Sequence, residues 1–131
     1  MRLTTSGPIE LRGDADGLKS AIENVVRNAL IYGDPSKPIE VEATTTGDQA
    51  LVRVLDRGPG VPEGELSRIF EPFYRTDKSR DHQKGGQGIG LAITTRVTEL
   101  HGGRVTARNR SGGGLEIDLT LPLGLSEAAA A

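Results

Sequence analysis

The sequence predicts an α/β protein of the α+β kind, a two-layer sandwich in which helices cover one face of a mixed, mostly antiparallel sheet. Two segments, 14–32 and 89–100, place their apolar residues at helical spacing. Short strand-like segments lie beside them, and two pairs of these are joined by glycine turns, which is typical of antiparallel hairpins. The 131 residues suffice for one domain, which we place at 1–123 with a C-terminal tail at 124–131.

The first predicted helix has the clearest pattern. Gly13 and Asp14 provide a turn and a helix cap, and seven apolar residues between Leu18 and Leu30 form one wide arc. Gly33 and the residues after it end the helix.

The strands are predicted from apolar and polar residues that alternate over short stretches. A turn at Gly47 joins one pair of strands, and three glycines at 112–114 join the last pair. The predicted strands are 9–11, 39–44, 51–55, 105–108 and 115–121.

A long segment, 56–90, is rich in glycine, proline and charge, with one short helical piece at 65–70. It also holds three of the four aromatic residues of the chain, namely Phe70, Phe73 and Tyr74. Such a segment inside a compact domain is typical of a functional lid or a binding loop.

Composition excludes several classes of protein. The net charge of −2 argues against a nucleic-acid partner bound through a broad basic face. The chain has no cysteine, and its two histidines, His82 and His101, are too few and too distant for an obvious zinc site. It shows no membrane-spanning run and no signal-peptide core. We therefore expect a cytoplasmic domain.

Two asparagines stand out in the first predicted helix. Asn24 and Asn28 share a face because they are four residues apart, and Tyr32 continues that face. Asparagine is a poor residue inside a helix because its amide competes for backbone hydrogen bonds, so the pair is consistent with ligand binding. The alternative is a solvated flank beside an ion pair between Glu23 and Arg27.

A second feature follows the strand at 51–55, where the sequence reads DRGPG. The Asp56 carboxylate could accept a hydrogen bond from an exocyclic amine, and Gly58 and Gly60 would let a flat ring approach the backbone. The alternative is an ordinary turn that closes a strand.

A third feature is the sequence GGQGIG at 85–90, directly before the second helix. Glycines there expose backbone N–H groups at the positive end of the helix dipole, which suits a phosphate. The alternative is a flexible hinge. Nearby cations that could reach phosphate oxygens are Arg75, Lys78, Arg80 and Lys84.

In this order and spacing, these features resemble the four sequence boxes of the catalytic, ATP-binding domain of bacterial sensor histidine kinases. That domain shares a superfamily with gyrase, Hsp90 and MutL ATPases. The boxes read NVVRNALIY (24–32), DRGPG (56–60), FEPFYR (70–75) and GGQGIGLAI (85–93). The resemblance covers about residues 9–122. Among these proteins, the sequence looks most similar to the osmosensor and envelope-stress kinases of proteobacteria.

The resemblance implies the Bergerat ATP-binding fold, with a mobile ATP lid at about 61–87, and Mg²⁺ and ATP as cofactors. Asn28 would bind the metal through its side-chain oxygen, and Asp56 would receive the adenine amino group. Tyr32 would pack near the base, and Gly58 and Gly60 would shape its pocket.

The resemblance also assigns the remaining site residues. Phe70 and Phe73 would anchor the lid, and Lys84 would join Asn28 as a catalytic residue. The further nucleotide-binding residues would be Asn24, Arg75, Lys84, Gly86, Gln87, Gly88, Ile89, Gly90 and Leu91.

One position separates subclasses of this superfamily, and another departs from the pattern of many relatives. The ATPases place a water-activating glutamate where this chain has Asn24, which cannot act as a base, so the resemblance implies a protein-histidine kinase. Many relatives place a phosphate-binding cation where this chain has Ile31. Ile31 leaves open a nucleotide-sensing pseudokinase, and an ATPase is a further alternative.

Neither His82 nor His101 lies in the sequence context of a phosphoacceptor histidine. The resemblance therefore implies that the acceptor lies on a separate dimerisation domain of a larger inner-membrane sensor, homodimeric when full-length, with a response regulator as its partner. The isolated domain is expected to be monomeric. His101 is predicted to cap the end of the second helix, and His82 to be solvated.

Overall fold

The computed structural model describes residues 2–5, 13–74 and 90–123, and it has the predicted two-layer architecture. Five strands form one sheet in the order β1-β2-β3-β5-β4. β1 is parallel to β2, and every other neighbouring pair is antiparallel. The strands are β1 (Arg2–Thr5), β2 (Glu40–Thr46), β3 (Gln49–Leu55), β4 (Arg104–Asn109) and β5 (Leu115–Pro122).

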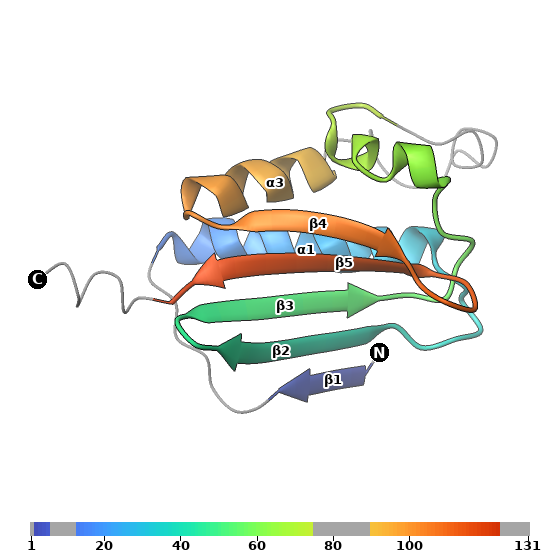
Figure 1. Cartoon of the computed structure of the whole chain (residues 1–131), viewed down its shortest axis with the longest axis horizontal. Helices are drawn as coiled ribbons and strands as arrows, with labels where there is room; N and C mark the ends of the chain where they lie inside the picture. The colour runs from blue at the N-terminus through green and yellow to red at the C-terminus, as the bar shows by residue number, and fades with distance from the viewer. Residues whose placement is uncertain (1, 6–12, 75–89, 124–131) are drawn as a thin grey trace, which may run out of the picture.

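Two α-helices, α1 (Ala15–Tyr32) and α3 (Gly90–Leu100), lie together on one side of this sheet (Figure 1). The two short 3-10 helices are η1 (Glu63–Glu65) and η2 (Arg68–Phe70). The prediction of one helical piece at 65–70 was therefore only partly right. A segment this short, preceded by proline and glycine, supports single 3-10 turns rather than a nucleated α-helix.

The first strand differs from the prediction. The structure places it at Arg2–Thr5, where it pairs with β2 in the register Leu3↔Val41. The predicted strand at 9–11 lies outside the described residues. Strand β1 is a four-residue edge strand with only one neighbour, and a stretch this short carries little alternation for a sequence pattern to reveal.

Helix α1 buries the apolar stripe that its periodicity predicts. Leu18, Ala21, Val25 and Ala29 recur at steps of three or four residues and are all buried. Val25 and Ala29 belong to one core cluster with apolar residues of the sheet, which include Val41, Val52, Val54, Ile117 and Leu119. The helix ends at Gly33, whose N–H donates to the Ala29 carbonyl at 2.8 Å.

The start of α1 is connected to the end of α3. Asp14 is the N-cap residue of α1, but its side chain makes no capping hydrogen bond. Instead, its backbone N–H donates to Nε2 of His101 at 3.0 Å, and Nδ1 of His101 lies 2.8 Å from the Val97 carbonyl oxygen. The predicted capping role of His101 is thus confirmed. Gly13 packs on this ring so closely that a Cβ atom there would overlap it.

A buried hydroxyl joins the two helices in their middle. Thr94 is completely buried, and its Oγ1 donates to the carbonyl oxygen of Ala21 in α1 at 2.8 Å. Thr98, one turn later and also fully buried, donates to the Thr94 carbonyl at 2.7 Å. These contacts fix the relative position of α1 and α3, which the site described below depends on.

The other face of the sheet is polar and carries ion pairs between neighbouring strands. Arg53 of β3 binds Asp118 of β5 through two hydrogen bonds, of 3.0 and 3.2 Å. Glu116 accepts from Nε of Arg108 in β4 at 2.9 Å. This is the face that the alternating strand pattern assigns to polar residues. In the part of the chain that the structure describes, no helix is long and apolar enough to cross a membrane.

Replacing Thr94 with valine should lower the free energy of unfolding by about 1 kcal/mol, because it removes one buried hydrogen bond at almost constant volume. Chemical denaturation of the purified chain measures this loss. The matched control is Thr95→Val, because Thr95 donates only to Leu91 within its own helix. Equal losses in the two variants would contradict a role for Thr94 in joining the helices.

Candidate functional site

Asp56 lies directly after β3 and is the most deeply buried carboxylate among the described residues, with 5% of its surface exposed. Its Oδ1 accepts two backbone hydrogen bonds, from Gly58 at 2.8 Å and from Leu115 at 3.1 Å. Its own N–H donates to the Leu115 carbonyl at 3.0 Å. No donor from the described residues reaches Oδ2, which leaves one buried carboxylate oxygen for a ligand.

Burial raises the pKa of Asp56 above its usual value. The two backbone N–H groups and the positive charge of Arg110 oppose this effect and favour the ionised form. An ionised carboxylate withdrawn from water binds a hydrogen-bond donor more strongly than a solvated one does. The site is therefore suited to a ligand that donates, such as an exocyclic amine.

The loop after Asp56 packs against the C-terminal end of α1. A Cβ atom at Gly58 would lie 2.9 Å from the Cα of Gly33 and would overlap the Tyr32 carbonyl oxygen. A Cβ atom at Gly33 would in turn lie 3.1 Å from the Cβ of Asp56. The structure therefore brings together three predicted site residues, Tyr32, Asp56 and Gly58.

The β4–β5 turn holds the same loop from the other side. Arg110 donates from Nη1 to the Asp56 carbonyl at 2.9 Å, and Arg57 donates to the carbonyls of Ser111 and Gly113, both at 3.1 Å. Gly114 leaves no room for a Cβ beside the Asp56 carbonyl.

Asn109, at the end of β4, binds the backbone where the loop continues. Its Nδ2 donates to the Val61 carbonyl at 2.6 Å, and its Oδ1 accepts from the Val61 N–H at 2.9 Å. Gly60, with φ of 74°, lies against the same side chain, and a Cβ there would be 2.6 Å from Oδ1. Gly60 is thus required by a left-handed backbone and by a close approach.

Sequence reasoning missed Asn109 and Arg110, which are distant from Asp56 along the chain. Polar residues beside a triple-glycine turn look like solvated turn residues. The register of the sheet would have found them, because Leu55 pairs with Glu116 and so places the turn next to Asp56.

The predicted polar face of α1 leads away from Asp56. Asn24, Asn28 and Tyr32 are all half-buried. The side chain of Asn28 makes no hydrogen bond with any described residue. Oδ1 of Asn24 lies 3.5 Å from Nη1 of Arg27, a weak contact. The alternative ion pair between Glu23 and Arg27 does not form between these two described residues.

The start of α3 meets the same helix one turn before Asn28. A Cβ atom built on Gly90 would lie 3.6 Å from the side chain of Asn24. From Asn24 to Tyr32, α1 rises about 12 Å at 1.5 Å per residue. The site is therefore elongated along α1, with Gly90 at one end and Asp56 at the other.

The remaining predicted site residues are either buried in the core or outside the described residues. Leu91 is buried in the core, so only its backbone is available to a ligand. The predictions that fall outside the described residues are those for Arg75, Lys84, Gly86, Gln87, Gly88 and Ile89.

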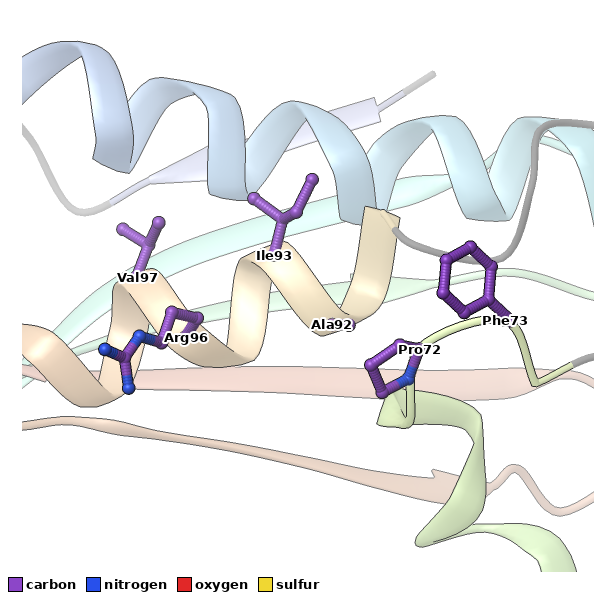
Figure 2. Close-up of a pocket in the computed structure, with 6 residues that line it drawn as sticks. All are labelled: Pro72, Phe73, Ala92, Ile93, Arg96 and Val97. Atoms are coloured by element: carbon purple, nitrogen blue, oxygen red, sulfur yellow. The ribbon is translucent and has the colours of Figure 1, made fainter.

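The two phenylalanines of the aromatic segment have different surroundings. Phe70 packs against the core, as an anchor would. Phe73 is 68% exposed and has a positive φ of 65°. Together with α3 it borders a shallow, open depression of about 320 Å³ (Figure 2). Its lining is Pro72, Phe73, Ala92, Ile93, Arg96 and Val97. None of these residues is among the predicted nucleotide-binding residues, so this depression is not the predicted nucleotide site.

Comparison with known sequences agrees with this geometry. Residues 13–125 match the family described as histidine kinase-, DNA gyrase B-, and HSP90-like ATPase. The sensor histidine kinase CpxA of Escherichia coli (strain K12) is 44% identical over 117 residues, which cover 89% of this chain and 25% of CpxA. BaeS, a signal transduction histidine-protein kinase of the same strain, is 36% identical over 115 residues, 88% of this chain and 25% of BaeS. The chain thus spans about a quarter of the length of these curated relatives.

Two solved structures have the same fold. The mycobacterial sensor histidine kinase MprB superposes with a TM-score of 0.82 at 30% identity, covering 93% of this chain and 80% of that one. Full-length ShkA in complex with AMPPNP gives a TM-score of 0.73 at 28% identity, covering 93% of this chain and 25% of that one. By its sequence and its fold, the chain belongs to the family of histidine kinase-, DNA gyrase B- and HSP90-like ATPases, and its relatives in that family are sensor histidine kinases.

Proposed function

We propose that this chain is the catalytic domain of a two-component sensor histidine kinase, which binds Mg-ATP and transfers the γ-phosphate to a histidine on a separate dimerisation and phosphoacceptor domain. The observation that carries the proposal is the buried Asp56 carboxylate, with Oδ1 saturated by backbone N–H groups and Oδ2 free of donors among the described residues. That arrangement matches the need of an adenine amino group for one buried acceptor.

The elongated shape of the site supports a nucleoside triphosphate as the ligand. With the base at Asp56, Gly58 and Tyr32, the phosphates would follow α1 toward Asn28 and the glycine-rich start of α3. Backbone N–H groups before α3 and the positive end of its dipole favour phosphate there. Lys84 and Arg75, which lie outside the described residues, are proposed as further phosphate ligands.

Asn28 is proposed to hold Mg²⁺ through its amide oxygen. Its side chain is half-buried and has no hydrogen-bond partner among the described residues, so the amide is available to a ligand. The described residues contain no cluster of three carboxylates or histidines that could hold the ion alone. Magnesium suits this situation, because phosphate oxygens and water complete its shell, and it would neutralise charge on the phosphates.

The reaction is proposed to be transfer to a protein nucleophile rather than to water. Asn24 lies one helical turn before Asn28 and cannot remove a proton from water. Glu23 is exposed and points about 100° around the helix from Asn24. With no base placed at this position, α1 would act by positioning the nucleotide for an incoming acceptor.

A nucleotide-sensing pseudokinase is the second candidate, and Ile31 favours it. This position lies three residues after Asn28, where many relatives of the family place a cation. Losing one charge-assisted hydrogen bond to phosphate would weaken binding by about tenfold or more. Such a module would bind ATP and transfer nothing.

The surrounding protein is also proposed from the relatives. CpxA and BaeS are about three and a half times as long as this chain, and they are named a sensor histidine kinase and a signal transduction histidine-protein kinase. We propose a homodimeric inner-membrane sensor with this domain in the cytoplasm, paired with a response regulator, and no nucleic-acid partner.

Calorimetric titration with AMPPNP, a non-hydrolysable ATP analogue, tests the nucleotide site. Asp56→Asn should weaken binding by about tenfold or more, because the amide nitrogen repels the adenine amino group and the charge is lost. The matched control is Asp48→Asn, since Asp48 lies at the opposite end of β3 in an exposed turn.

The same titration tests the metal site. Magnesium should tighten binding to the wild-type chain and should have little effect on Asn28→Ala. Absence of wild-type binding at millimolar AMPPNP would overturn the proposed nucleotide site. Equal affinities of the Asp56→Asn and Asp48→Asn variants would overturn the assignment of Asp56.

Phosphate release from ATP tests the proposed reaction. The wild-type chain should release phosphate well below about one per second, the low end of ordinary enzyme turnover, because no base activates water. Asn24→Glu should raise this rate and Asn24→Gln should not, because only the glutamate can accept a proton. Label from γ-labelled ATP should appear on a histidine of the dimerisation and phosphoacceptor domain of the same protein when that domain is supplied. Fast release by the wild-type chain would instead indicate an ATPase, and binding without label transfer would favour the pseudokinase.

A further inference from the structure

The β4–β5 turn contacts the proposed adenine-binding residue at both its main chain and its side chain. Arg110 donates from Nη1 to the main-chain carbonyl of Asp56 at 2.9 Å. Leu115, five residues later, donates its N–H to Oδ1 of the same residue at 3.1 Å. Gly114, with φ of 115°, permits this approach, because any Cβ there would overlap the Asp56 carbonyl.

Arg110 is itself well ordered by its surroundings. Its side chain is only 13% exposed, and Nη2 lies 3.7 Å from the Glu40 carboxylate in β2. It therefore connects the start of β2, the β4–β5 turn and the end of β3. A guanidinium suits this task because its donors lie in one rigid plane.

We infer that Arg110 is a positioning residue of the nucleotide site, which holds the main chain of Asp56 so that its carboxylate stays in place for the adenine amino group. This inference rests on the proposed function, because it assumes that Asp56 binds adenine. Arg110 acts through Asp56 and is not one of the residues proposed to contact the nucleotide.

The charges around Asp56 give this arrangement a second consequence. Arg110 is the charged side chain that favours the ionised form of Asp56 and so opposes the rise of its pKa on burial. Arg57, the next residue, directs its guanidinium to the Ser111 and Gly113 carbonyls. Glu40 lies beside Arg110. The C-terminal end of α1 contributes Tyr32. Asp34, two residues later, accepts a hydrogen bond from the Ser36 N–H. Removing the charge of Arg110 should therefore raise the pKa of Asp56 further.

The test is calorimetric titration of the chain with Mg-AMPPNP between about pH 5 and pH 8. The variants are Arg110→Met, which keeps length and loses charge, and Arg110→Lys, which keeps the charge. The matched control is Arg108→Met, which removes an arginine of β4, two residues before Arg110, that binds Glu116 instead. Thermal unfolding of each variant checks that it is folded.

Arg110→Met should weaken binding by about five- to tenfold at neutral pH, because a charged donor to Asp56 is lost. As the pH falls, its affinity should begin to drop at a higher pH than that of the wild type, since Asp56 becomes protonated sooner. In Arg110→Lys, the pH at which the affinity begins to drop should return to its wild-type value. Any titration of the AMPPNP phosphates is common to all the variants and does not affect the comparison.

Three outcomes would overturn the inference. Arg110→Met could bind like Arg108→Met, or it could weaken binding equally at every pH with no recovery in Arg110→Lys, which is the behaviour of a purely structural contact. If Arg110→Met does not fold, Arg110→Gln takes its place, and binding by that variant equal to that of Arg108→Met would overturn the inference. Failure of the wild type to bind AMPPNP would instead count against the proposed function, on which the inference depends.

Discussion

The arrangement of this domain depends on one buried carboxylate that is half satisfied by the protein. Asp56 emerges from β3 between the end of α1 and the β4–β5 turn, and backbone donors occupy only its Oδ1. An unpaired polar group at this depth is costly unless a ligand completes it. Positions 33, 58 and 114 are glycine because the three segments approach one another too closely there for a side chain. A ligand that donates a hydrogen bond to Oδ2 would offset the free energy lost in burying Asp56, and we propose that this donor is the adenine amino group.

The rest of the domain keeps the two ends of the site at a fixed separation. Helix α1 supplies Tyr32 at the Asp56 end and Asn24 at the end where α3 begins. The buried hydroxyl of Thr94 in α3 donates a hydrogen bond to Ala21 near the middle of α1. The ring of His101, which directly follows α3, accepts a hydrogen bond from Asp14 at the start of α1. The sheet beneath presents an apolar face to the helices and an ion-paired face on its other side. Packing far from Asp56 therefore sets the separation between the two ends of the proposed nucleotide site.

Much of this could be predicted from sequence, because it depends on local periodicity. The helix at α1, the two hairpins and the position of Asp56 after a strand all follow from patterns a few residues long. Residues whose role depends on pairing between distant segments were not predicted. Arg110 and Asn109 act across the sheet, so only the register of β3 with β5 brings them to the loop. The edge strand β1 was not predicted, because a stretch of four residues carries too little alternation to be recognised in the sequence.

Asp56 is proposed to recognise the amino group of adenine, and deleting that group from the ligand is the most direct test. Calorimetry should compare ATP with purine riboside triphosphate, which differs only in lacking the exocyclic amine. The wild-type chain should bind ATP about tenfold more tightly or better, and this preference should largely disappear in Asp56→Asn. Equal affinity of the wild-type chain for the two nucleotides would contradict it.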